Sequence, residues 1–408
     1  MPTKKIAIVG AGPAGLMAAE VLSQYSNQFP NQSYEIHVFE QKPSAARKFL
    51  MAGKTGLNIS HAEPIEQFIQ RYDQVDWLKP WVEQWDAQWI QSWMQGLGIE
   101  SYIGSSGRVF PVEMKAAPLL RAWLKRLAEQ NVQFHYRHQI LDLKKQKITI
   151  KNLKDQAVFE QEFDAIILAC GAVSWSRLGS DGAWQQWLSA QEIEPFQTSN
   201  AGVVRTWSKF MQPVFGQPLK RVEAWVEHSN SVKAQGDIVI SHYGLESGLI
   251  YKQGRALRDL QKKSQKLQIN LDLLPDQSLE QLIQKLQPSK KQSTNNIWRK
   301  AGLDAAKSNL IRELVDKSLW NHPEELARQI KHLKIELEGF RPIDEAISCA
   351  GGIKQQQFTE HLQLKSNPYV FCCGEMLDWD APTGGYLLTA CFATGRAAGE
   401  GVHQYLES

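Results

Sequence analysis

The stretch KKIAIVGAGPAG, residues 4–15, decides the fold class. Its apolar run at residues 6–9 is typical of a short strand that is buried on both faces of a parallel sheet. Three glycines with the spacing G-x-G-x-x-G follow, and residues 13–25 continue with apolar side chains at helical spacing. A strand, a glycine turn and a helix in this order predict the first βαβ unit of a dinucleotide-binding domain.

Each glycine of this turn has its own function. Gly10 permits the tight turn out of the strand, Gly12 lets a pyrophosphate approach the backbone, and Gly15 lets the helix pack closely on the strand. The helix begins at Pro13 and Ala14, where its free N–H groups and the positive end of its dipole face the phosphates. We therefore expect these five residues to bind the cofactor.

A second expected strand, residues 34–39, ends in Glu40, which lies 25 residues after Gly15. An acid at this position accepts hydrogen bonds from the adenosine ribose and disfavours a 2′-phosphate. Gln41 and Lys42 follow directly and belong to the expected site. This βαβ unit suits both NAD and FAD, so the rest of the chain must decide between them.

Four further segments place glycine, basic or acidic residues at strand ends and in loops. Residues 47–60 form a basic, glycine-punctuated loop, and residues 105–111 read SSGRVFP. Residues 164–175 read as an apolar strand that runs into a turn of small residues. Residues 369–388 read as a strand, an acid-rich loop and the start of a helix that continues to about residue 403.

With these segments the chain resembles the HI0933-like flavoproteins, a family of FAD-dependent oxidoreductases related to the glutathione-reductase type. The resemblance covers essentially the whole length. The family's patterns are similar to G-R-K-x-x-x-S-G-x-G-R-C-N, G-R-x-F-P, T-H-x-G-x-S-G and G-E-x-L-D-x-x-x-x-x-G-G-Y. Ala46, Lys54, Leu57 and Glu246 depart from the family's glycine, arginine, cysteine and serine. These departures indicate a distinct branch without an assigned substrate.

The resemblance implies FAD as the cofactor. It assigns Gly374 and Glu375 to the ribityl and pyrophosphate groups, and the helix start after Gly384 and Gly385 to the flavin pyrimidine. Backbone N–H groups at a helix start stabilise the negative charge that a flavin gains near N1 and O2 on reduction. The expected cofactor-binding set also contains Arg47, Lys48, Gly53, Gly56, Leu57, Asn58, Ala169, Gly171, Asp378, Tyr386 and Leu387.

The expected fold class is α/β, with a discontinuous, Rossmann-like, three-layer FAD-binding domain. Residues 1–195 and 341–408 form this domain, and residues 196–340 form an inserted β-rich and helical unit. The resemblance implies that the insert is a lid over the flavin. The strand-like runs of the insert are residues 201–206, 220–227 and 237–241, and its helical runs are residues 278–287 and 296–320.

The catalytic candidates are Arg108, His242 and Tyr243. Arg108 suits an anionic or carbonyl group of the substrate, and His242 and Tyr243 suit proton donation. The alternatives are a structural arginine and two ordinary hydrogen-bonded side chains. The chain has no second G-x-G-x-x-G and no cysteine pair suited to disulfide reduction. We therefore expect either NAD(P)H as a transient reductant that docks at the flavin face, or another reductant.

Five tryptophans, Trp77, Trp81, Trp85, Trp89 and Trp93, recur with a spacing of four. On one helix this spacing drifts by about 40° per step, because 3.6 residues make a turn. We expect most of these rings to pack in a core or against another subunit. A stacking surface for a substrate or a partner is the alternative.

Composition limits the remaining classes of function. The 408 residues carry a formal net charge of +3, which gives no general argument for nucleic-acid or membrane binding. Five cysteines without a CxxC pair predict reduced thiols, no disulfide framework and no metal site. No signal peptide and no run of about 20 apolar residues is visible. We expect a cytoplasmic protein, and the sequence does not predict its oligomeric state.

Three hypotheses about function follow. The first is an FAD-dependent oxidoreductase that transfers a hydride to or from a C=C or C–C bond of a small molecule. The second is a flavin-dependent reductase that acts on uridine in RNA; residues 252–300 contain eleven Lys or Arg against four Asp or Glu, although a solvated face explains this equally. The third is a non-catalytic FAD-binding module for redox sensing or assembly.

Overall fold

The computed structural model describes residues 3–28, 34–54, 56–227, 232–263, 266–288 and 292–408. The chain divides into two compact units, one formed by Met1–Gln197 with Ser348–Ser408 and the other by Thr198–Ile347. Each unit has a hydrophobic core of its own. The sequence places a similar division at residues 195/196 and 340/341, and a lid function for the insert stays a prediction.

A parallel sheet forms the centre of the first unit, with the strand order β20-β10-β1-β2-β6. Its apolar segments pair in register, so that Ile8 of β1 lies between Val38 of β2 and Ile167 of β10. The strand from the C-terminal part of the chain, β20, pairs with β10. The bounds are β1 Lys4–Val9, β2 Tyr34–Glu40, β6 Gln133–Tyr136, β10 Ala165–Leu168 and β20 Val370–Cys372.

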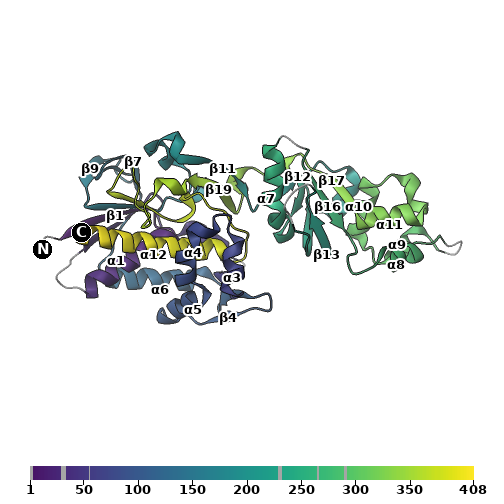
Figure 1. The fold of residues 1–408 in the computed structure, drawn as a ribbon, viewed down its shortest axis with the longest axis horizontal. Coiled ribbons are helices and arrows are strands. Elements are labelled where there is room, and N and C mark those ends of the chain that lie inside the picture. Colours follow the sequence, from purple (N-terminus) through teal and green to yellow (C-terminus); the bar gives the residue numbers. More distant parts are fainter. Residues whose placement is uncertain (1–2, 29–33, 55, 228–231, 264–265, 289–291) are drawn as a thin grey trace. The chain divides into compact units, whose positions relative to one another are not determined.

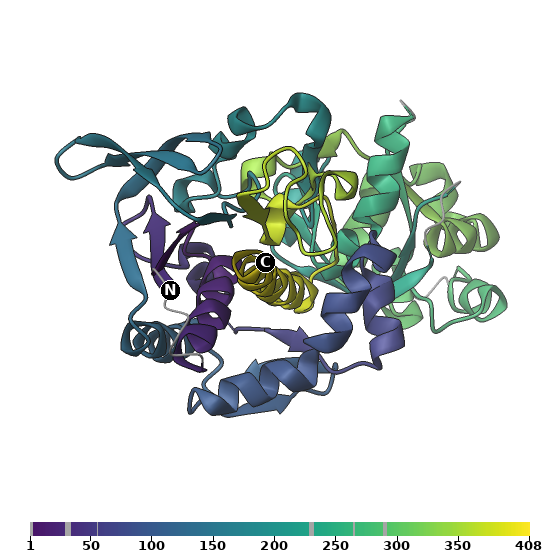
Figure 2. The same ribbon diagram turned by 60° about the vertical axis from the view of Figure 1, so that its left-hand side comes forward.

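Helices cover one face of this sheet, and a three-stranded antiparallel sheet covers the other (Figure 1). The helices are α1 (Pro13–Gln28), α6 (Ala116–Glu129) and α12 (Tyr386–Glu407), and the second sheet consists of β7 (His138–Lys144), β8 (Lys147–Asn152) and β9 (Val158–Glu162). The contact between α1 and α12 is close, as Figure 2 also shows. A Cβ on Gly395 of α12 would lie 2.4 Å from the Ala14 carbonyl oxygen of α1. These layers confirm the expected three-layer α/β domain.

The five tryptophans lie on two helices rather than on one. Helix α4 (Val75–Gln84) ends before Trp85. Asp86 caps the next helix, α5 (Ala87–Gly96), by accepting a hydrogen bond from the Trp89 N–H at 2.8 Å. The treatment of the five rings as one helical series is therefore wrong, because an aspartate N-cap restarts the helix. Trp77, Trp85 and Trp93 are buried in the core.

The remaining elements of the first unit connect these layers. A small sheet has the order β3-β5-β4, and β11 pairs with β19. The bounds are α2 Arg47–Ala52, β3 Ser60–His61, α3 Ile65–Phe68, α4 Val75–Gln84, α5 Ala87–Gly96, β4 Ser101–Ile103, β5 Arg108–Pro111, β11 Ile193–Ser199 and β19 Ser348–Ile353.

The second unit contains a seven-stranded antiparallel sheet with the order β17-β16-β13-β14-β15-β12-β18. Its strands are β12 Val203–Val204, β13 Pro218–Trp225, β14 Ala234–Ser241, β15 Gly244–Glu246, β16 Gln268–Asp272, β17 Leu333–Glu336 and β18 Gly339–Phe340. Its helices are α7 Gly248–Lys262, α8 Leu279–Lys285, α9 Thr294–Ala301, α10 Ala305–Leu314 and α11 Pro323–Lys331.

The expected helical run at residues 296–320 is interrupted. Gly302 ends α9 in a left-handed conformation, and Asp304 caps α10 by accepting a hydrogen bond from the Lys307 N–H at 2.9 Å. All five cysteines are free thiols, as expected, and four of them are buried. Over the described ranges, no helix combines the length and apolar character needed to cross a membrane.

Candidate functional site

A cleft of about 1000 Å³, counted with the solvent at its mouth, opens at the carboxyl ends of β1, β2, β10 and β20. The chain leaves β1 toward β2 on one side and reaches β10 and β20 on the other, so the cleft lies where the strand order reverses. Ligands of open α/β sheets bind at this position.

The glycine turn forms the floor of the cleft. A Cβ on Gly10 would lie 2.4 Å from the carbonyl oxygen of Ala169, and one on Gly15 would lie 2.0 Å from that of Gly10. A Cβ on Gly12 would have no atom within 4 Å. The protein's own packing thus requires glycine at positions 10 and 15. At Gly12 only the open cleft lies beyond the backbone.

Glu40 holds a fixed carboxylate beside this turn. One oxygen accepts a hydrogen bond from the Lys42 N–H at 2.7 Å, and the other accepts one from the Ala11 N–H at 3.2 Å. Burial raises the pKa of Glu40, while the two backbone donors oppose this rise. Each carboxylate oxygen keeps a further lone pair, so the group can still accept hydrogen bonds from a ribose.

Two cationic side chains at the start of α2 line the cleft. The Ala46 N–H donates to the Ala11 carbonyl at 2.9 Å, which holds the start of α2 against the glycine turn. Ala46 adopts a left-handed conformation with φ 52°, at the position where the family pattern has glycine. The Arg47 Nε is buried and has no hydrogen-bond partner in the part of the chain that the structure describes. This unpaired donor fits an anionic ligand group.

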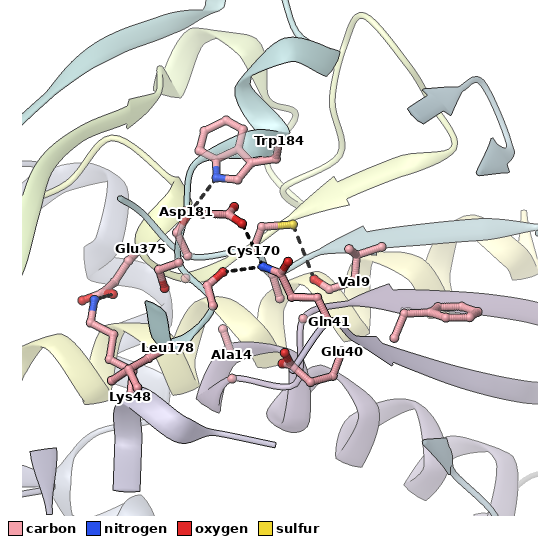
Figure 3. A pocket seen from close by; sticks show the side chains of 18 of the residues that line it. Val9, Ala14, Glu40, Gln41, Lys48, Cys170, Leu178, Asp181, Trp184 and Glu375 are labelled. Atoms are coloured by element: carbon pink, nitrogen blue, oxygen red, sulfur yellow. Dashed lines mark hydrogen bonds and ion pairs between the residues drawn. The ribbon is translucent and has the colours of Figure 1, made fainter. Parts of the chain in front are cut away.

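Lys48, which also lines the cleft, makes two polar contacts within the protein. Its Nζ donates to the Ser174 hydroxyl at 2.8 Å and forms an ion pair with Glu375 at 2.8 Å. Figure 3 shows Lys48 and Glu375 on one side of the cleft and Glu40 on the other. One carboxylate, Glu375, therefore lies on one side of the cleft and a second, Glu40, lies on the other side.

A segment after β10 lines the cleft opposite the glycine turn. The Gln41 amide donates to the Gly179 carbonyl at 2.9 Å and to the Asp181 carboxylate at 3.1 Å. The Trp184 indole donates to the Gly171 carbonyl at 2.9 Å (Figure 3). Gln41 thus links the loop after β2 to this segment.

Comparison with known proteins identifies the family. The chain matches the family described as HI0933-like protein Rossmann domain over residues 4–401. The chain belongs to this family. It is 21% identical over 410 residues to the 3-dehydro-bile acid delta(4,6)-reductase of Clostridium scindens, and the match covers 97% of this chain and 98% of the relative. The family and this relationship confirm the expected oxidoreductase class, against a non-catalytic module.

Solved structures share the fold of this HI0933-like chain. The open conformation of a flavocytochrome c3 fumarate reductase has a TM-score of 0.52 at 13% identity, covering 100% of this chain and 79% of that one. Mycobacterium smegmatis Sdh1 with UQ1 has a TM-score of 0.50 at 13% identity, covering 100% of this chain and 69% of that one. Family and fold together support FAD as the cofactor.

Twelve of the residues expected from the sequence to bind the cofactor line the cleft of this HI0933-like chain. They are Gly10, Gly12, Pro13, Ala14, Glu40, Gln41, Arg47, Lys48, Ala169, Gly171, Gly374 and Glu375. The other expected residues are not among those that line the cleft: Gly15, Lys42, Gly53, Gly56, Leu57, Asn58, Asp378, Gly384, Gly385, Tyr386 and Leu387. A cofactor role stays a prediction for all the expected residues.

Further lining residues escaped the sequence analysis. They are Val9, Phe39, Ala46, Phe49, His138, Gln139, Ile140, Cys170, Leu178, Gly179, Ser180, Asp181, Ala183, Trp184, Trp187, Cys373 and Cys391. Many of them directly flank segments that the sequence singled out. Residues 138–140 and 178–187 lie in a strand and a loop without a ligand motif.

The start of α12 has a structural reason for its glycine. Gly385 has φ 96°, and a Cβ there would lie 2.4 Å from the Ser60 Cα. The Tyr386 hydroxyl donates to Glu63 at 2.6 Å, and the Tyr72 hydroxyl donates to the Tyr386 carbonyl at 2.8 Å. The missing Cβ thus permits a close approach between two backbone segments of this family member.

The three catalytic candidates lie in both units. Arg108 is an exposed residue of β5 in the first unit, and His242 and Tyr243 connect β14 to β15 in the second. The Tyr243 hydroxyl donates to Glu246, and the Arg341 guanidinium lies over the Tyr243 ring at 4.4 Å. Burial, together with Glu246, raises the pKa of Tyr243. Its phenol therefore stays protonated at neutral pH and is a weaker acid than an ordinary tyrosine.

Proposed function

We propose that the cleft of the first unit binds FAD and that the protein transfers a hydride between this flavin and a C=C or C–C bond of a small molecule. The observation that carries the proposal is that the buried Arg47 Nε, without a hydrogen-bond partner among the described residues, lies in a residue that lines the same cleft as the open backbone of Gly12. A cationic donor and a helix N-terminus that face one cleft suit a pyrophosphate.

Each part of the cofactor has a partner of suitable chemistry in this proposal. Glu40 accepts hydrogen bonds from the adenosine ribose, and Gly12 with the start of α1 holds the pyrophosphate. Arg47 adds positive charge to that contact. Glu375 suits the ribityl hydroxyls, because a carboxylate accepts several hydrogen bonds.

The protein supplies orientation and protons to the reaction. Bound FAD provides hydride-transfer chemistry. When a C=C bond is reduced, one carbon receives the hydride and the other receives a proton. Tyr243 is the proposed proton donor and His242 its alternative, while Arg108 binds an anionic or carbonyl group of the substrate. NAD(P)H is the proposed transient reductant.

The relative supports the proposed substrate class. A reductase of a bile acid is related to this chain over almost its full length. This relationship supports a C=C bond in a small molecule that also carries a carbonyl or acidic group as the target. The second hypothesis from the sequence, a uridine in RNA, has no further observation in its favour.

Rapid-mixing spectroscopy without oxygen tests the proposal. The purified protein, loaded with FAD, is mixed with NADH or NADPH and then with an enone such as a 3-keto-4-ene steroid. Loss of flavin absorbance near 450 nm, and its return on addition of the enone, are the expected results. A flavin that neither nucleotide reduces would contradict NAD(P)H dependence, and a reduced flavin that the enone leaves unchanged would contradict the substrate class.

A further inference from the structure

The Lys48–Glu375 ion pair lies in the cleft that is proposed to bind the cofactor. Both side chains line the cleft, and their side-chain exposures are only 24% and 16%. The ammonium group has a second fixed partner, because it donates to Ser174, whose side chain is fully buried. Lys48 is thus held by two partners: Ser174, which lies in the segment after β10, and Glu375, which lies in the C-terminal part of the chain.

Glu375 creates an electrostatic problem for the proposed cofactor. FAD carries a negatively charged pyrophosphate, and an unpaired carboxylate in the same low-dielectric cleft would repel it. The position of Glu375 is fixed by its neighbour, since the Gly374 N–H donates to the Thr394 hydroxyl at 3.0 Å and Gly374 has φ 81°. The carboxylate therefore needs a counter-charge.

We propose that Lys48 is a positioning residue that neutralises Glu375 and holds its carboxylate in the orientation that accepts the ribityl hydroxyls of FAD. This inference rests on the proposed binding of FAD in the cleft. Arg47 has a different role in this arrangement, because its Nε has no hydrogen-bond partner within the described ranges and is free to bind the anionic ligand itself.

The charge state of Lys48 agrees with this role. Burial alone would lower the pKa of Lys48, but the ion pair and hydrogen bond with Glu375 raise it above the ordinary value. The ammonium form therefore persists across the range in which the protein would work. Removal of one partner from a buried pair leaves an uncompensated charge, whereas removal of both does not.

Equilibrium titration of the apoprotein with FAD, followed by flavin fluorescence, tests this coupling. Lys48→Met should weaken FAD binding at least tenfold, because Glu375 is then unpaired. The double variant K48M/E375Q should bind FAD at least threefold more tightly than K48M, because the repulsive charge is gone. Lys48→Arg should stay within threefold of the wild type, since it keeps the charge.

Two controls separate this proposal from others. Lys79→Met removes a lysine from an exposed pair, with Lys79 Nζ 3.8 Å from Glu83 and exposures of 49% and 41%, and should change FAD affinity less than twofold. Thermal unfolding of each apoprotein shows whether a variant folds; the double variant leaves no unpaired charge and is the one to use if K48M unfolds.

The outcomes are distinct. A wild-type protein that does not bind FAD would overturn the proposed function itself. A wild type that binds FAD, together with a K48M variant of equal affinity or a double variant no tighter than K48M, would overturn the role of Lys48 alone.

Discussion

Substitution of Gly12 separates cofactor binding from folding. A Cβ at Gly12 would meet no atom within 4 Å, so Gly12→Ala leaves the apoprotein's packing intact. Its free energy of unfolding should be unchanged or higher by about 0.4–1 kcal/mol, because alanine restricts the unfolded chain. The added methyl group projects into the cleft, where it holds the pyrophosphate away from the backbone.

The magnitude follows from the hydrogen bonds lost. Each hydrogen bond to a charged group contributes about 1.5–3 kcal/mol, and about 1.4 kcal/mol corresponds to a factor of ten in affinity. Loss of one such bond should weaken FAD binding by at least about tenfold. Gly15→Ala is the matched variant: its Cβ would lie 2.0 Å from the Gly10 carbonyl oxygen, and overpacking of this kind costs about 1–3 kcal/mol of stability.

Urea unfolding of each apoprotein and fluorescence titration with FAD give both quantities. We expect Gly12→Ala to lose affinity without losing stability and Gly15→Ala to lose stability. A Gly12→Ala protein that binds FAD like the wild type, or that is as unstable as Gly15→Ala, would refute the reasoning.

Two further predictions concern pH and the segment opposite the glycine turn. Burial, with His37 and His138 nearby, lowers the pKa of His135 from 6.5 to about 4. The unfolded chain therefore binds a proton at this residue more readily than the folded chain does. The contribution of neutral His135 to the free energy of unfolding should be fully present above about pH 6.5 and should be lost as the pH falls toward 4. His135→Phe should reduce that loss of stability by at most about 2 kcal/mol, after a discount for partial exposure. Urea unfolding of the wild type and the variant at pH 7 and at pH 5 measures the loss in each protein. An equal loss in both would contradict the prediction. Gln41→Ala removes the hydrogen bonds to Gly179 and Asp181 and should release FAD about three- to tenfold faster, since each bond contributes about 0.5–1.5 kcal/mol; an unchanged rate of fluorescence recovery after dilution would count against it.

The sequence predicted the centre of the fold because that information is local. An apolar strand, a glycine turn and a helix occupy consecutive residues, and the Cβ distances at Gly10 and Gly15 confirm why glycine is needed there. The family resemblance supplied the return of the C-terminal strand to the same sheet. Residue spacing alone carried no such long-range information.

The missed features depend on tertiary contacts or on single capping residues. Trp184 reaches the cleft because its indole bonds to the Gly171 carbonyl, and His138 does so because β7 follows β6 past the end of β2. Neither Trp184 nor His138 belongs to a sequence motif for ligand binding. The helix breaks at Asp86 and Gly302 did have signals, an aspartate N-cap and a left-handed glycine, which periodicity arguments overlooked.

The most direct test of the account is a crystal structure of the purified protein after incubation with FAD. It should show one FAD per chain in the cleft of the first unit, with the ribose on Glu40, the pyrophosphate at Gly12 and the ribityl chain near Glu375. Flavin density elsewhere on the chain, or an empty cleft at saturating FAD, would contradict the central claim.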